Sequence, residues 1–235
     1  MEIWKEWSLD LCCSSMYAMI REMSKAAKSV SQKMNEVCTD FQETVFPAIK
    51  ESLNANKCVS PEETGSSIDY KEGVDHELHR KDGSVINVGS RICYQHHATF
   101  TVTRKVDPKS DKKAEYRKRM TEYENNLLTV DYVFQAYMAG HQEELINVAY
   151  CRAEEFYEFI AEGDESDEYY RDEDGFQRAK DGDFWTQEKN KDEEFLCVSW
   201  IDLLESDRVP SLHIINKTHT GKPISPDYDH VAETS

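Results

Sequence analysis

Hydrophobic positions between residues 9 and 41 recur at alternating intervals of three and four. They are Leu9, Cys13, Met16, Ile20, Met23, Ala27, Val30, Met34, Val37 and Phe41. A seven-residue repeat of this kind predicts one long helix with a narrow apolar seam about 50 Å in length. Two partners for the seam stay open. One is another surface of the same chain, and the other is a second copy, which makes a coiled-coil homodimer through 9–41. Met and Ala at seam positions specify register poorly.

The pattern changes to a period of two between residues 67 and 104. Strands are predicted over 69–78, over 85–94 and over 99–103, with a turn at 81–84. Strands joined in this order predict an antiparallel meander. Further on, the pattern predicts helices at 112–125 and 152–161, separated by strands at 130–138 and 145–150.

These elements divide the chain into five parts. Pro47 can kink or end the first helix, and the polar stretch at 60–67 links it to the next unit. We expect a helical part at 1–60, an α/β core at 67–161, an acidic segment at 162–194, a return element that packs on the core at 195–222, and a mobile tail at 223–235. The fold class is α+β, with a mixed sheet flanked by helices.

Charge is distributed unevenly along the chain. The net charge is −18, from 46 acidic and 28 basic residues, and residues 153–194 hold 17 of the acidic residues against 5 basic ones. Residues 104–119 are basic instead, which predicts a local positive face. No apolar run approaches the roughly 18 residues that a membrane span needs, and the amino terminus does not resemble a signal peptide. We therefore expect a cytoplasmic protein without a membrane partner.

Cysteine and histidine offer weaker signals. The seven cysteines are scattered and form no C-x-x-C pair, so neither a disulfide framework nor a zinc knuckle is favoured. Asp75, His76 and His96 offer ligands for a zinc or manganese site, but adjacent strand residues point to opposite faces, which argues against it. We expect the cysteines to be reduced, buried hydrophobic residues.

The order helix, three strands, helix, strand resembles the core of the PD-(D/E)xK nucleases. The resemblance implies a Mg²⁺ ion held by carboxylates from the second and third strands, with a lysine that orients the attacking water. Asp75 stands where the first carboxylate is expected. Gly89 and Arg91 replace the Glu and Lys of the E-x-K element, and arginine cannot act as a base. Glu115, on the following helix, is the candidate replacement metal ligand.

Three short motifs also resemble largely uncharacterised phage and bacterial proteins. These motifs are Thr99-Phe100-Thr101-Val102, Ala114-Glu115-Tyr116-Arg117-Lys118-Arg119 and Tyr132-Val133-Phe134-Gln135-Ala136-Tyr137. The resemblance spans residues 73–150. It implies a site formed by Asp75, Arg91, Glu115, Lys118, Gln135 and Tyr137. Each of these residues also has a plainer interpretation, as a solvated helix face, a cross-strand ion pair or a buried hydrogen bond.

Three functions follow as hypotheses. The first is a phage-type protein that acts on or binds nucleic acid, and it includes a Mg²⁺-dependent DNA nuclease with metal ligands Asp75 and Glu115. Its predicted phosphate contacts are Arg91, Arg104, Lys105, Lys112, Lys113, Arg117 and Arg119. The second is a catalytically inactive interaction module. The third is an acidic DNA mimic, in which residues 162–194 occupy a basic groove on a host defence protein in the host cytoplasm. A solvated acidic loop is the plainer interpretation of that segment.

Overall fold

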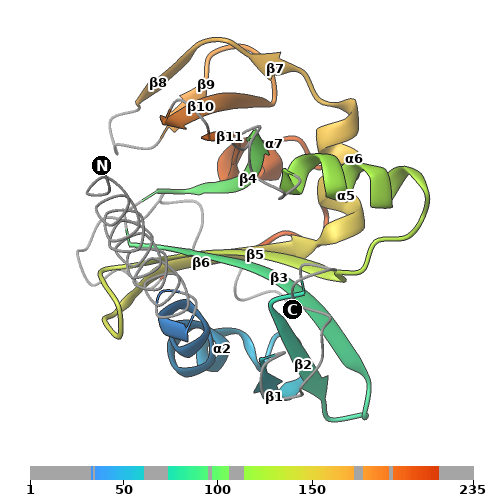
Figure 1. The fold of residues 1–235 in the computed structure, drawn as a ribbon, viewed down its shortest axis with the longest axis vertical. Coiled ribbons are helices and arrows are strands. Elements are labelled where there is room, and N and C mark those ends of the chain that lie inside the picture. The colour runs from blue at the N-terminus through green and yellow to red at the C-terminus, as the bar shows by residue number, and fades with distance from the viewer. Residues whose placement is uncertain are drawn as a thin grey trace, which may run out of the picture.

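The computed structural model describes residue 33 and residues 35–60, 74–94, 97–105, 114–171, 177–190 and 193–216. Most of the predicted 9–41 helix therefore lies outside the described residues, as do Lys112, Lys113 and the tail at 223–235. Within the described part the chain is α+β, as predicted (Figure 1). No helix there is long and apolar enough to cross a membrane.

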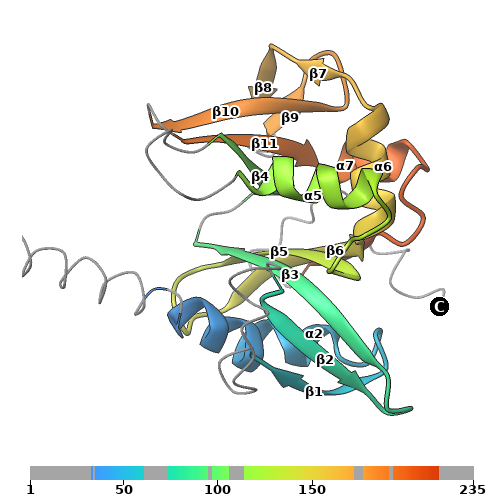
Figure 2. The same cartoon turned by 45° about the vertical axis from the view of Figure 1, so that its right-hand side comes forward.

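A six-stranded mixed sheet forms the centre of the fold (Figures 1 and 2). Its order is β1 (Ala55–Val59), β2 (His76–Arg80), β3 (Val85–Cys93), β5 (Tyr132–Met138), β6 (Leu145–Arg152) and β12 (His213–Asn216). Neighbours are antiparallel except β3 and β5, which are parallel. A parallel pair requires a crossover, and here the crossing chain contains β4 (Thr99–Lys105) and α5 (Glu115–Glu124).

A second, four-stranded sheet lies on one side of the central sheet (Figure 2). Its order is β4, β11 (Glu193–Ser199), β10 (Phe184–Asn190) and β7 (Glu165–Ser166), and β8 (Tyr169–Arg171) pairs separately with β9 (Gln177–Ala179). The helix α6 (Ala153–Glu162) contacts both β5 and β6. A short helix, α7 (Trp200–Glu205), begins at an N-cap where the Ser199 hydroxyl accepts a hydrogen bond from Asp202 N.

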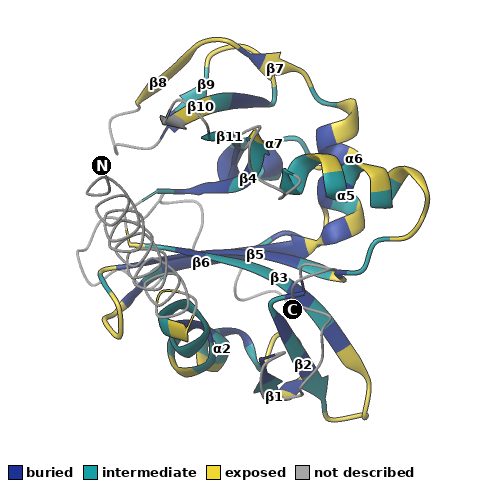
Figure 3. Ribbon diagram, viewed as in Figure 1, coloured by how far each residue is buried: buried dark blue, intermediate teal, exposed yellow. Residues whose placement is uncertain are grey.

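The central sheet separates two hydrophobic cores (Figure 3). Odd-numbered β5 residues such as Val133 and Tyr137 face the second sheet, α5 and α6, where Trp200 and Phe156 are buried. Even-numbered ones such as Phe134 face the helical segment η1 (Phe41–Val45) and α2 (Phe46–Ile49). This alternation is the period of two that a strand imposes on its side chains.

The first predicted helix ends at Ile49, two residues after Pro47. Residues 35–49 are helical throughout, and η1 is a π-helix that runs directly into α2. Pro47 occupies a first-turn position of α2, where its missing N–H is tolerated. The wider π turn immediately before it accommodates the proline without ending the helix.

The predicted meander is wrong in its third strand. Residues 99–103 do belong to a strand, β4, but β4 pairs with β11 in the second sheet. The structure completes the meander with β1, which lies in the part of the chain assigned to the helix. Of the predicted 69–78 strand, residues 69–73 lie outside the described part of the chain, and β2 runs from His76 to Arg80. The acidic segment contributes β7 to β10, and the return element supplies β11 and β12, one strand to each sheet. Strand pairing depends on contacts far apart in sequence, which local periodicity does not report.

Candidate functional site

Arg91 lies at the centre of the predicted site, between the two sheets. Its guanidinium donates to Glu115 Oε2 and to Thr103 Oγ1, each at 2.9 Å, and more weakly to Thr101 Oγ1 at 3.5 Å. The Phe195 ring lies beneath the guanidinium, with its centroid 5.0 Å away. One arginine from β3 therefore contacts β4, α5 and β11, and holds the second sheet to the central one.

Gln135 and Tyr137 on β5 extend the polar contacts of Arg91 along the space between the sheets. We call these three residues, with Glu115 and the threonines of β4, the polar row. Gln135 is the cross-strand partner of Arg91, and its Oε1 accepts hydrogen bonds from Thr101 N and Thr101 Oγ1. Tyr137 donates to Thr99 O at 2.8 Å and lies 2.9 Å from Thr99 Oγ1. Both side chains are 1% exposed, and burial raises the pKa of the Tyr137 hydroxyl. At neutral pH this tyrosine is therefore a neutral hydrogen-bonding group.

The cavity beside this row has a volume of about 30 Å³. Such a space is close to the volume of one water molecule. It is lined by Arg91, Thr101, Glu115 and Gln135 together with apolar residues of β4, β5 and α6. The row is therefore packed as a protein interior, and no small-molecule substrate fits between these side chains in the described arrangement.

Asp75 approaches β3 where the β2–β3 ladder ends. Its backbone N–H donates to Val88 O, and its Oδ2 accepts from Ser90 N at 2.6 Å. The Asp75 carboxylate thus accepts the hydrogen bond that a backbone carbonyl of β2 would accept if the ladder continued. Asp75 and Glu115 contact consecutive β3 residues, but one binds the Ser90 main chain and the other the Arg91 side chain. Their joint coordination of Mg²⁺ stays a prediction.

The remaining predicted residues lie on β4 and α5. Lys118 Nζ is 3.8 Å from Glu122 Oε1, and Arg119, which is 3% exposed, donates to Glu122 and Thr129 inside the fold. Arg104 pairs with Glu165 and Glu194 of the second sheet. Lys105 and Arg117 are exposed. The sequence predicts a positive face at 104–119, and acidic residues of the second sheet neutralise part of it.

His76 belongs to the core and not to a polar site. Its ring stacks on Phe41 with centroids 4.1 Å apart, and it is 0% exposed. Burial lowers its pKa from 6.5 to about 3, so the ring is neutral. Within the described ranges, no group of three or more His, Cys, Asp or Glu side chains is arranged to hold a metal ion.

Sequence reasoning missed Thr101, Thr103 and Phe195 as members of this row. The alternation of Thr99, Thr101 and Thr103 is visible in the sequence and places the three hydroxyls on one face of a strand. Nothing in the sequence signals Phe195, because it reaches Arg91 only through the pairing of β11 with β4.

The chain was compared with known protein families, curated proteins and solved structures. No protein-family model, no curated protein and no solved structure matches the chain.

Proposed function

We propose that the chain is a catalytically inactive interaction module, of the kind found in phage, that docks onto a basic protein surface through its acidic segment at 162–194, with β8 at the contact. The observation that carries the inactive assignment is the Arg91 guanidinium seated on Glu115. A cation in hydrogen-bonding contact with a carboxylate competes with Mg²⁺ for that carboxylate. Because Arg91 also binds Thr103, removing it to admit a metal would break contacts between the sheets.

The acidic segment supports the docking part of the proposal. Residues 162–194 hold 14 acidic and 5 basic residues. Tyr169 and Tyr170 on β8 are 49% and 54% exposed, and the neighbouring Asp167 and Asp181 are exposed as well. Exposed tyrosine is a residue type enriched at protein interfaces. Because neighbours on a strand point to opposite faces, Tyr169 and Tyr170 place one ring on each side of β8. A strand with tyrosine on both sides and carboxylates around it suits a basic groove that normally holds a nucleic-acid backbone.

The first experiment separates this proposal from the Mg²⁺-dependent nuclease. The protein is incubated with single-stranded and duplex DNA in Mg²⁺ or Mn²⁺, beside the Asp75→Ala and Glu115→Ala variants. We expect no cleavage by any of the three proteins. Cleavage by the wild type that both substitutions abolish would establish the nuclease in its place.

The second experiment tests docking. Labelled duplex DNA is bound to each member of a panel of basic DNA-binding proteins, and its displacement by the chain is measured as fluorescence anisotropy. We expect displacement from at least one member, weakened by about tenfold or more when Tyr169 and Tyr170 are both changed to Ser. A separate control for charge is Glu143→Gln with Glu158→Gln, which removes two exposed carboxylates away from β8. An equal loss in the control would show a general charge effect and contradict docking through β8.

A further inference from the structure

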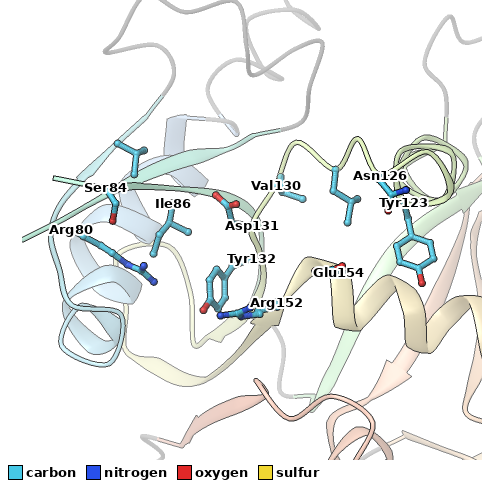
Figure 4. A pocket seen from close by; sticks show the side chains of 12 residues that line it. Arg80, Ser84, Ile86, Tyr123, Asn126, Val130, Asp131, Tyr132, Arg152 and Glu154 are labelled. Atoms are coloured by element: carbon cyan, nitrogen blue, oxygen red, sulfur yellow. The ribbon is translucent and has the colours of Figure 1, made fainter. Parts of the chain in front are cut away.

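A cavity of about 480 Å³ opens at the end of the central sheet (Figure 4). It lies where β2 and β6 end and β3 and β5 begin, and the last turn of α5 and the first turn of α6 complete its wall. Small-molecule sites commonly have volumes of about 300–1,000 Å³. The cavity is therefore large enough for a metabolite, unlike the narrow space beside Arg91.

Two arginines enter the cavity from different strands. In Figure 4 the guanidinium groups of Arg80 and Arg152 point toward the Tyr132 ring from two sides. Arg80 Nε donates to Leu53 O at 3.1 Å, which fixes that side chain. Tyr132 and Arg152 are cross-strand partners, so their side chains lie on the same face. Among the described residues neither guanidinium forms a salt bridge within 4 Å, although the charge of Arg80 interacts favourably with the nearby Asp82 carboxylate.

Unpaired guanidinium groups are notable in a chain of net charge −18. With many carboxylates available, most of the other arginines described form ion pairs, as Arg91, Arg104 and Arg208 do. Each of the two guanidinium groups carries N–H donors that no salt bridge to a described residue occupies, and such donors match the oxygens of a phosphate group. A dianionic phosphate also fits two positive charges better than a single carboxylate does.

The rest of the cavity wall supplies acceptors, including the carboxylates of Asp131 and Glu154. Asp131 Oδ2 accepts from Asn87 N at 2.7 Å, which orients the carboxylate, and its other oxygen makes no hydrogen bond to a described residue. Ser84 and Asn126 add polar groups at the rim, and the Tyr132 ring gives a partly exposed aromatic surface. An aligned carboxylate accepts hydrogen bonds from hydroxyl or amino groups, whereas it repels a bare anion.

We propose that this cavity binds a small phosphate ester of nucleotide size. Arg80 and Arg152 hold the phosphate, Tyr132 contacts the body of the ligand, and Asp131 accepts from its hydroxyl or amino groups. This binding does not rest on the proposed docking of the acidic segment.

Titration calorimetry with four defined probes tests the proposal: adenosine 5′-monophosphate, ribose 5-phosphate, inorganic phosphate and adenosine. We expect at least one of the two esters to bind with a dissociation constant below about 1 mM, and adenosine to bind about tenfold or more weakly. Inorganic phosphate should bind more weakly than the better ester, because it cannot reach Asp131.

Arg152→Met should weaken binding of that ester by about tenfold or more, because one set of charge-assisted hydrogen bonds is lost. The matched control is Arg117→Met, which removes one exposed positive charge outside the cavity and should leave the affinity unchanged. Circular dichroism of both variants checks that the fold is retained, and Arg80→Lys provides a second cavity variant that keeps the charge but loses the paired donors.

Several results would overturn the assignment. These are the absence of ester binding up to about 10 mM, adenosine binding as tightly as its monophosphate, and equal losses in Arg152→Met and Arg117→Met. Binding of a single-stranded oligonucleotide with no binding of either ester would also overturn it, since the site would then belong to a nucleic-acid surface.

Discussion

Asp40 holds His141 at 3.0 Å across 101 residues of sequence. The carboxylate is 1% exposed and also accepts from Tyr94 Oη at 2.7 Å and from Gln142 N at 2.8 Å. It thereby joins the residue before η1 to the turn between β5 and β6 and to the end of β3. A buried carboxylate with three donors is well satisfied, and this contact anchors the described end of the N-terminal helix to the sheet.

This contact predicts a pH dependence of stability. The hydrogen bond to Asp40, with the nearby negative charges, raises the pKa of His141 above 6.5. The folded state therefore binds the proton more tightly than the unfolded state. The stabilisation is complete below pH 6.5 and is lost as the pH rises through the raised pKa. In urea unfolding between pH 5.5 and 9, we expect His141→Gln to remove this decline. Parallel curves for the two proteins would contradict the prediction.

His76 predicts a dependence of the opposite sign. Its pKa falls to about 3 on burial, so the unfolded state takes up a proton at pH values where the folded state does not. Stability should decrease by about 1.4 kcal/mol for each pH unit below 6.5, down to about pH 3. Neither ring nitrogen has a hydrogen-bond partner among the described residues.

His76→Phe is the informative variant, because phenylalanine preserves the stacking on Phe41 and removes the titrating group. We expect its stability at pH 4.5 to exceed that of the wild type by about 2–3 kcal/mol, with a smaller difference at pH 7.5. Chemical unfolding at the two pH values measures this. An equal change at both would show a packing effect without proton linkage.

The Arg91–Glu115 pair predicts coupled losses of stability. Arg91→Met should destabilise the fold by about 1–3 kcal/mol, because hydrogen bonds to Glu115 and Thr103 are lost. Glu115→Gln alone should cost less, since 40% of that side chain is exposed. A double-mutant cycle measured by urea unfolding should give a coupling of about 0.5–2 kcal/mol. Additive losses would mean that the pair does not hold the two sheets together.

Two glycines form a matched pair for backbone strain. Gly83 and Gly182 both have φ of +86°, a conformation that costs an L-residue about 1–2 kcal/mol. A Cβ at Gly83 meets no atom within 4 Å, whereas one at Gly182 lies 2.5 Å from Asp164 O. We expect Gly182→Ala to destabilise by about 2 kcal/mol more than Gly83→Ala in thermal unfolding. Equal effects would show that the β9–β10 connection adjusts to the added methyl group.

Local hydrophobic patterns were sufficient to predict the type and position of several elements. The predicted helices at 112–125 and 152–161 correspond to α5 and α6, and the strand at 130–138 corresponds to β5. Periodicity succeeded there because each element has one buried face that repeats within its own residues. The same alternation predicts that Arg91 and Gln135 lie on strands, and the structure makes them cross-strand partners.

Periodicity and composition were enough to predict the α+β class, the positions of α5, α6 and β5, and the uneven distribution of charge. Three relationships became visible only in the folded chain: β4 joins the second sheet, Arg91 binds Glu115, and Arg80 and Arg152 share a cavity. Hydrogen bonding between strands and pairing of charges join residues far apart in the chain. Such contacts have no period in the sequence, whereas the burial of one face of a helix or strand does.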